Sequence, residues 1–346
     1  MIRLLLVEDS VTQREILRRM IEGDSGFTVI AEAKNGREAV AFVEKYRPDV
    51  VLMDLHMPDM DGVMATREIM RRTPVPIVVA SASLKQQEVD LGLEALQAGA
   101  VAVVEKPEGA VLLHLEKIAP LLRSELLIAS KAKVKRRGLG SLKSPPVEEI
   151  SQASSIADVI GICASTGGPP VLVDILGKIP RPYPIPILLV QHISANFVPG
   201  FARWLGDTTG QRVCIAGPYE RMTPGIWVSP GGKHLCAAEL QRIVLKPPFS
   251  SSELHCPSGN ALFSSLAQVY GSRAIGVLLT GMGDDGAEGL LELRRRGGRT
   301  LVQDEASSLI YGMPRAARER GAADSGHSPS ELIQILTLMA ENQAVN

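Results

Sequence analysis

The sequence is poor in cysteine and close to neutral in charge. Its cysteines show no C-x-x-C spacing and stand in or beside apolar segments, at Cys163, Cys214, Cys236 and Cys256. This pattern argues against a disulfide framework or a cysteine-bound metal and favours reduced thiols in the cytosol. The formal net charge of −1 excludes a global field that would attract nucleic acid or an anionic membrane. We therefore expect no nucleic-acid partner.

Long apolar runs are also missing. The opening segment MIRLLLVEDS has only a short apolar run before two acids, whereas a signal peptide needs a longer one. No stretch approaches the roughly 18 apolar residues of a membrane span. We expect a cytoplasmic protein that does not insert into the membrane.

The length of 346 residues exceeds that of one ordinary domain and predicts two domains. The first domain is expected over 1–122, where short apolar runs alternate with amphipathic stretches. Five strands are predicted there: LLLV at 4–7, TVIAEA at 28–33, VVLMDL at 50–55, IVVASA at 77–82 and VAVVEK at 101–106. This alternation is typical of a doubly wound, flavodoxin-like parallel sheet with helices on both faces.

A second α/β domain is expected over 156–346. Its mainly parallel sheet would contain DVIGICAS at 158–165, PILLVQH at 186–192, AIGVLLTG at 274–281 and TLVQDE at 300–305. Proline and glycine interrupt 212–247, which predicts a small antiparallel insertion. Residues 123–155 are basic and then rich in serine, so we interpret them as a linker, helical at most at its start. A contact of this basic run with an acidic partner is the alternative.

Charged and hydroxyl side chains stand at the strand ends expected in the first domain. They are Glu8 and Asp9 after the first strand, Asp54 at the end of the third, Ser81 of the fourth and Lys106 of the fifth. Ligands of open parallel sheets bind beyond these ends. Three converging acids favour a hard cation such as Mg²⁺, and the full set suits transfer of a phosphoryl group to a carboxylate. Each residue alone could instead cap a helix or solvate a strand end.

The segments LLLVEDS, MDLHMPDMDG, VVASA and EKP resemble the signature segments of bacterial response-regulator receiver domains. The resemblance implies that Asp54 is the phospho-acceptor and that Ser81 and Lys106 contact the phosphoryl group. The implied Mg²⁺ ligands are Glu8, Asp9, Asp54 and the backbone carbonyl of His56. Val103 departs from the pattern, because receivers commonly carry at this position an aromatic ring that turns inward on activation.

Ser165 is the candidate nucleophile of the second domain. It follows an apolar strand and opens the turn Ser165-Thr166-Gly167-Gly168-Pro169-Pro170, where amides at a helix start can stabilise an oxyanion. The match to G-x-S-x-G is incomplete, because Cys163 stands where the first glycine is expected. A turn that cradles a nucleotide phosphate is therefore an alternative interpretation.

A base and an orienting acid are expected at the same sheet edge. His192 ends the apolar strand ILLVQH, and Asp285 opens a helix after TGMGDDG. Together with Ser165 they would form a Ser-His-Asp triad, although a structural His192 and a helix-capping Asp285 are alternatives. The remaining histidines are expected to have surface or capping roles: His56, His114, His234, His255 and His327.

These residues, with VSPGGKH at 228–234, CPSGNALF at 256–263 and QDEASSLIYGMPRAA at 303–317, resemble the chemotaxis protein-glutamate methylesterase family over roughly 156–340. The resemblance implies a phosphorylation-activated serine hydrolase that acts on glutamate methyl esters of methylated chemoreceptors and deamidates receptor glutamines. A chemotaxis histidine kinase would be the phosphodonor, and the esterase would need no cofactor.

The same resemblance assigns the site residues of the second domain. Ser165 would be the nucleophile, His192 the general base and Asp285 the orienting acid, whereas Asp284 would not be catalytic. Backbone amides near Thr166 and Met282 would form the oxyanion hole. Cys163 replaces the first glycine of the family's usual Gly-Ala-Ser-Thr-Gly-Gly. The alternative functions are a receiver-gated hydrolase or a non-enzymatic output module that acts on another signalling partner.

Overall fold

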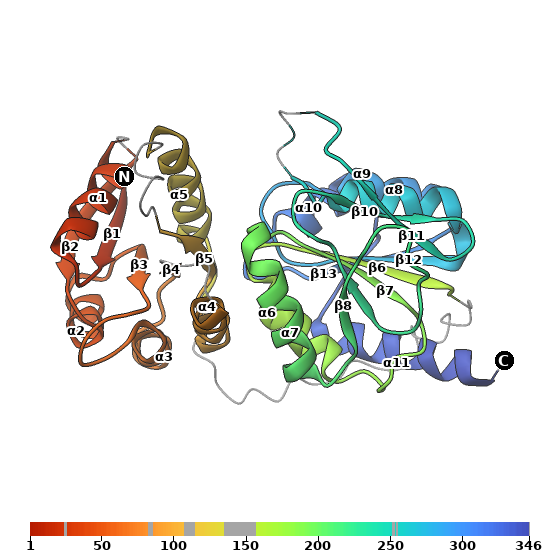
Figure 1. Ribbon diagram of the computed structural model, residues 1–346, viewed down its shortest axis with the longest axis horizontal. Helices are drawn as coiled ribbons and strands as arrows, with labels where there is room; N and C mark the ends of the chain where they lie inside the picture. The colour runs from red at the N-terminus through yellow and green to blue at the C-terminus, as the bar shows by residue number, and fades with distance from the viewer. Residues whose placement is uncertain are drawn as a thin grey trace. The chain divides into compact units, whose positions relative to one another are not determined.

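The computed structural model describes residues 1–23, 26–81, 86–106, 115–134, 157–250, 253 and 255–345. The chain divides into two compact units, Met1–Ser141 and Leu142–Asn346 (Figure 1). Helix α5 (Leu115–Ser130) extends into the predicted linker, whose remainder from 135 to 155 lies outside the described residues together with His114. No helix in the described part of the chain has both the length and the apolar character needed to cross a bilayer.

The first unit contains one parallel sheet of five strands in the order β2-β1-β3-β4-β5. Its strands are β1 (Ile2–Val7), β2 (Phe27–Ala33), β3 (Val50–Asp54), β4 (Ile77–Ser81) and β5 (Ala102–Glu105). The helices besides α5 are α1 (Val11–Glu22), α2 (Gly36–Tyr46), α3 (Gly62–Arg72) and α4 (Gln86–Ala98). The five predicted βα units and the flavodoxin-like strand order are confirmed. The order reverses between β1 and β3, which is where such sheets bind their ligands.

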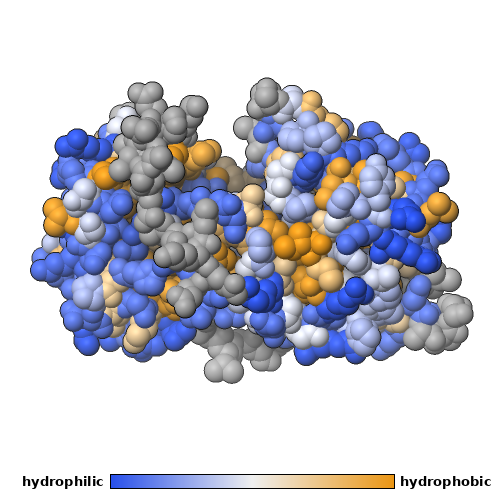
Figure 2. Space-filling model, in the orientation of Figure 1, coloured by the Kyte–Doolittle hydropathy of each residue, from blue (hydrophilic) through white to orange (hydrophobic). Residues whose placement is uncertain are grey.

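The residues themselves explain these elements. β3 and β4 are buried along their whole length, as expected when helices cover both faces of a parallel sheet. Polar side chains begin the helices: Ser10, Asn35 and Asp61 each accept a hydrogen bond from a backbone amide in the first turn. Figure 2 shows the complementary pattern, with mainly hydrophilic side chains on the visible surface.

The second unit contains a parallel sheet of seven strands in the order β14-β13-β12-β6-β7-β9-β8 and an antiparallel pair, β10-β11. The strands are β6 (Val159–Ala164), β7 (Ile187–Gln191), β8 (Val213–Ile215), β9 (Ile226–Val228), β10 (His234–Ala238), β11 (Arg242–Lys246), β12 (Ala274–Leu278), β13 (Arg299–Gln303) and β14 (Gly326–His327). The helices are α6 (Gly168–Leu176), η3 (Ala195–Phe197), α7 (Val198–Thr209), α8 (Gly259–Val269), η4 (Gly271–Arg273), α9 (Ala287–Arg295), α10 (Met313–Glu319) and α11 (Pro329–Val345).

Helices cover both faces of the seven-stranded sheet, with α8, α9 and α10 on one face and α6, α7 and α11 on the other (Figure 1). The side of α8 that faces the sheet places Leu262, Phe263 and Leu266 in the core. β6 and β7 are fully buried at the centre. The chain continues from β6 to β7 on one side and later returns to β12 on the other, so the strand order reverses at β6.

The predicted antiparallel insertion over 212–247 is smaller than expected. β10 and β11 form the antiparallel pair, but β8 and β9 continue the main sheet in parallel, with Ile226 beside Ile187 of β7. Each of these two strands has three residues, too few to show a periodicity in the sequence. Tertiary pairing, rather than local pattern, determines their direction.

Candidate functional site

The predicted acidic residues of the first unit come together at the carboxyl ends of β1 and β3. Glu8 and Asp54 are buried, with 1% and 4% of their surface exposed, and each has an oxygen within 4.8 Å of an oxygen of the exposed Asp9. The ammonium of Lys106 lies 2.7 Å from Glu8 Oε2 and 2.6 Å from Asp54 Oδ1. Residues from three strand ends thus form one cluster of charged side chains.

This cluster contains three carboxyl groups and one ammonium group. Burial and the neighbouring Asp54 raise the pKa of Glu8, although Lys106 opposes them. Burial lowers the pKa of Lys106, but Asp54 and Glu8 outweigh it and raise that pKa above its ordinary value. Lys106 therefore stays charged and offsets one of the three carboxylates. The remaining charge and the cluster of carboxylate oxygens fit a hard divalent cation such as Mg²⁺, which receiver domains bind at this site.

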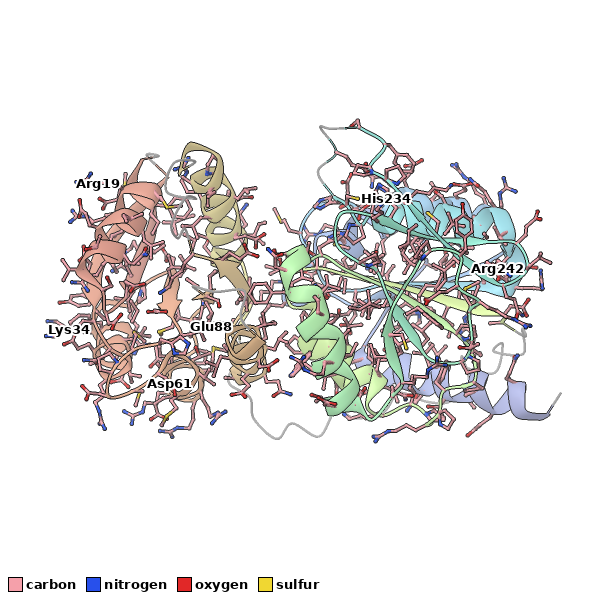
Figure 3. The ribbon with its side chains drawn as sticks, viewed as in Figure 1. Arg19, Lys34, Asp61, Glu88, His234 and Arg242 are labelled. Carbon is pink, nitrogen blue, oxygen red and sulfur yellow. The ribbon has the colours of Figure 1, made fainter. Side chains whose placement is uncertain are left out.

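Ser81 and His56 have a common partner on α4. The buried Ser81 hydroxyl donates to Glu88 Oε2 at 3.2 Å, and the other oxygen of Glu88 pairs with the His56 imidazole. Glu88 is labelled on α4 in Figure 3. The His56 backbone amide donates to Asp54 Oδ1 at 3.3 Å, which places this residue beside the acidic cluster. Glu88 was not predicted, because an acid inside an amphipathic helix carries no distinguishing signal in the sequence.

Ser165 follows β6 and is held from both neighbouring strands. Its amide donates to the Thr280 carbonyl at 3.0 Å, and Gln191 Nε2 donates to its carbonyl at 2.9 Å. Ala164 pairs with Gln191 in the parallel register, so Ser165 and His192 follow at corresponding positions on β6 and β7. The predicted meeting of these residues at one sheet edge is confirmed.

The turn after Ser165 requires glycine. Gly167 has φ of 80°, and a Cβ there would lie 2.7 Å from the side chain of Leu309. The loop after β12 packs on the other side, where a Cβ on Gly281 would lie 2.6 Å from Ser165 Cβ. Thr280 Oγ1 also donates to the Thr166 carbonyl at 3.1 Å. Of the predicted oxyanion residues, Thr166 follows Ser165 directly, and Met282 follows Gly281, which packs against Ser165.

His192 and Asp285 form a direct pair. His192 Nε2 lies 2.9 Å from Asp285 Oδ2, and Asp285 also accepts hydrogen bonds from Ser258 Oγ at 2.7 Å, Gly259 N at 2.6 Å and Asn260 N at 3.1 Å. Burial raises the pKa of Asp285, but the hydrogen bonds from His192, Ser258 and Gly259 outweigh burial and hold this pKa far below its ordinary value. The carboxylate therefore remains ionised.

The other nitrogen of His192 is left available. Nδ1 is buried and has no hydrogen-bond partner among the residues that the structure describes, so no bond to Ser165 is formed in this state. Because Nε2 is held by Asp285, Nδ1 is the atom that can accept a proton. The neighbouring Asp284 is exposed and pairs with Arg320, which separates the roles of the two adjacent acids.

Two histidines differ from their expected roles. The His255 ring stacks on that of His192, with centroids 4.5 Å apart and 7° between the ring planes. His234 is fully buried at the start of β10 and contacts Glu253 at 3.1 Å (Figure 3). The expected surface or capping roles are therefore wrong for both. His255 stands three residues before the helix cap Ser258, and only the tertiary fold brings it to His192.

Cys163 is buried next to His192 and Asp285. Its sulfur lies within 4.8 Å of ligand atoms of both His192 and Asp285, and a Cβ on Gly259 would come to 2.5 Å from it. Burial, followed by the charge of Asp285, raises the pKa of this thiol well above its ordinary value. Cys163 therefore acts as a small apolar side chain and not as a thiolate.

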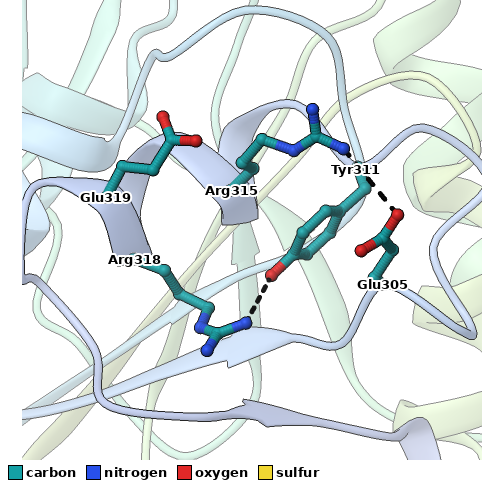
Figure 4. A pocket seen from close by; sticks show the side chains of 5 residues that line it. All are labelled: Glu305, Tyr311, Arg315, Arg318 and Glu319. Atoms are coloured by element: carbon teal, nitrogen blue, oxygen red, sulfur yellow. Dashed lines mark hydrogen bonds and ion pairs between the residues drawn. The ribbon is translucent and has the colours of Figure 1, made fainter.

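A surface pocket of about 430 Å³ borders this region, lined by Glu305, Tyr311, Arg315, Arg318 and Glu319 (Figure 4). Tyr311 connects it to the site through a bridge to Gly281. The Tyr311 hydroxyl accepts a hydrogen bond from Arg318 at 3.1 Å, and Arg315 lies 3.7 Å from Glu305. The charged groups of this pocket are mostly engaged with one another.

Known proteins resemble both units. The CheB methylesterase family model matches residues 160–336, and the response regulator receiver domain model matches 4–116. Protein-glutamate methylesterase/protein-glutamine glutaminase 2 of Methanospirillum hungatei is 39% identical over 99% of each chain. The corresponding protein 3 of Myxococcus xanthus is 40% identical over 94% of this chain and 90% of its own.

A solved structure agrees with the second unit. The crystal structure of the Thermotoga maritima CheB methylesterase catalytic domain matches with a TM-score of 0.50 and 29% identity, over 53% of this chain and 98% of that one. The matched segments include Ser165, His192 and Asp285 at the edge of the larger sheet, and Asp54 in the smaller one. The chain belongs to the CheB methylesterase family, with a receiver domain preceding its methylesterase domain.

Proposed function

We propose that this chain is a serine hydrolase that removes methyl groups from glutamate methyl esters of chemoreceptors and deamidates receptor glutamines. The names of its relatives support the substrate class. One observation carries the chemistry: His192 is hydrogen-bonded to an ionised, buried Asp285 at the sheet edge that presents Ser165. An imidazole oriented by a carboxylate beside a serine is the arrangement that activates a hydroxyl nucleophile.

In the proposed mechanism, His192 Nδ1 takes the hydroxyl proton of Ser165 while the serine oxygen attacks the γ-carbonyl carbon. Asp285 stabilises the imidazolium that forms, and the backbone amides of Thr166 and Met282 stabilise the oxyanion. His192 then gives its proton to the methoxy oxygen, and methanol leaves. Water attacks the glutamyl-serine ester by the same proton exchange and releases glutamate. With a glutamine substrate, ammonia is the leaving group.

The receiver is proposed to control this activity through phosphorylation of Asp54 by a chemotaxis histidine kinase. Mg²⁺ would be held by Glu8, Asp9, Asp54 and the His56 carbonyl, and when bound it neutralises charge on the transferring oxygens. Lys106 already contacts Asp54, whereas Ser81 would have to leave Glu88 to reach the phosphoryl group. The four free cysteines fit the reducing cytoplasm as the place of action.

The test is methanol release from methylated chemoreceptor membranes by the full-length protein, with and without a small phosphodonor and Mg²⁺. We expect release that rises with the phosphodonor and is lost in Ser165→Ala. The adjacent acids provide a matched pair: Asp285→Asn should abolish most of the release, whereas Asp284→Asn should retain it. Absence of release, with phosphorylation of Asp54 verified, would leave the receiver intact and reject this substrate.

A further inference from the structure

The loop before α8 contacts two members of the triad. Ser258, Gly259 and Asn260 donate hydrogen bonds to Asp285. Three residues before Ser258, His255 places its ring on the face of the His192 imidazole. The segment 255–260 therefore holds the acid by hydrogen bonds and the base by ring stacking.

The stacking geometry restricts the orientation of His192. A centroid distance of 4.5 Å with 7° between the planes means that one face of the His192 ring is covered by a parallel ring. Rotation of the His192 imidazole out of its plane would collide with His255. With Nε2 on Asp285, the covered ring holds Nδ1 in one direction, and Ser165 stands at the corresponding position after the adjacent strand.

The charge of His255 matters because His192 must become an imidazolium during the reaction. Burial is the main cause that lowers the pKa of His255, followed by the positive charge of His192. The acids that face it, Asp285, Asp284 and Glu253, act in the opposite direction but do not outweigh these two causes. A neutral ring allows positive charge to appear on its stacked neighbour, whereas a second cation at this distance would oppose it.

We propose that His255 is a positioning residue for the catalytic base, a neutral stacked ring that fixes the plane of His192 and favours proton transfer from Ser165. This inference rests on the proposed serine chemistry but does not depend on the methyl ester being the substrate. If the His255 ring only filled space, its removal would lower the stability of the protein and leave the reactivity of Ser165 unchanged. A positioning role predicts a change in the reactivity of Ser165 and in its pH dependence.

The test measures the rate at which a fluorophosphonate probe labels Ser165 in the full-length protein, as a function of pH, with Ser165→Ala as the blank. We expect His255→Ala to lower the plateau rate about ten- to a hundredfold, because the base is no longer held in the reactive orientation. The acid limb of its pH–rate profile should also shift, because the stacked ring no longer covers His192. Thermal unfolding of each variant shows whether it is folded.

His255→Phe is the matched variant, because it keeps a flat, neutral ring at the same place. We expect it to retain the rate within a few-fold and to leave the acid limb near its original pH. An unchanged rate and pH profile in a folded His255→Ala would overturn the proposal, as would a His255→Phe as impaired as the alanine variant. Normal labelling of the unsubstituted protein without methanol release would instead reject only the proposed substrate.

Discussion

Asp285 shows how single hydrogen bonds set the chemistry of the site. Its carboxylate is buried, which by itself favours the neutral acid, and yet four donors keep it ionised. The Ser258 hydroxyl makes two hydrogen bonds: it donates to Asp285 and accepts from the Ala261 amide at the start of α8. Removing this hydroxyl should therefore affect both stability and catalysis.

Ser258→Ala is expected to lower the free energy of unfolding of the second unit by about 1.5–3 kcal/mol at neutral pH, the usual value for a hydrogen bond to a charged group. The folded pKa of Asp285 is lowered, so its contribution is present above the unfolded value of about 3.9 and is lost as pH falls through the folded value. The difference in free energy of unfolding between the variant and the original protein should thus become smaller only below about pH 4.

Urea unfolding followed by tryptophan fluorescence measures this difference in free energy of unfolding, because the two tryptophans, Trp204 and Trp227, both lie in the second unit. Ser258→Thr keeps the hydroxyl and serves as the control. A stability cost of Ser258→Ala that is the same in an Asp285→Asn background would show that the hydroxyl acts through the helix cap and not through the ionised carboxylate.

Cys163 leads to a prediction of the opposite kind, with stability changed and chemistry retained. We expect Cys163→Gly to lower the free energy of unfolding by about 1–2 kcal/mol, because it removes a buried side chain and adds backbone freedom to a strand. Methanol release should stay within a few-fold, because the thiol is protonated and has no part in the mechanism. A loss of release greater than tenfold in a folded Cys163→Gly would show that the sulfur assists the triad.

At the scale of elements, the sequence predicted the strands that carry the site better than the contacts around it. β3, β6 and β7 are apolar strands of five or six residues that end in a polar residue or are followed directly by one, so Asp54, Ser165 and His192 could be placed at sheet edges. β8 and β9 are too short for a periodic signal, and their parallel pairing follows from the sheet that they join. His255 and Glu88 contact the sites across separate elements, which local pattern cannot reveal.

The loop between β12 and α9 provides an element-scale prediction. A Cβ at Gly281 would lie 2.2 Å from Met313 Sδ and 2.6 Å from Ser165 Cβ, so Gly281→Ala must displace the loop or the nucleophile. We expect methanol release to fall at least tenfold, because small misplacements of reacting groups are costly. Adding Met313→Ala removes the first conflict and leaves the second, so the double variant should stay impaired. If the double variant recovered methanol release, the conflict with Met313, and not the one with Ser165, would be the cause of the lost activity.

At the scale of the whole chain, two units of the same class carry different chemistry at equivalent places. In each sheet a side chain with a proposed chemical role lies where the strand order reverses: Asp54 ends β3, beside the reversal between β1 and β3, and Ser165 follows β6, at which the second sheet reverses. The fold explains where these sites occur, and the side chains at the strand ends explain what each can do. Coupling between the units is a separate property that must be measured on the intact chain.

The prediction for the intact chain concerns this coupling. Asp54→Asn keeps the shape of the side chain but removes the carboxylate that would accept a phosphoryl group, so the increase in methanol release caused by phosphodonor and Mg²⁺ should disappear. Coupling free energies of about 1–3 kcal/mol correspond to increases of roughly 5- to 150-fold, which such an assay resolves easily. Asp59→Asn is the matched control, since this exposed acid lies in the loop that follows Asp54. If Asp54→Asn responded to the phosphodonor as strongly as Asp59→Asn does, activation would not depend on this carboxylate, and the proposed control by the receiver would be rejected.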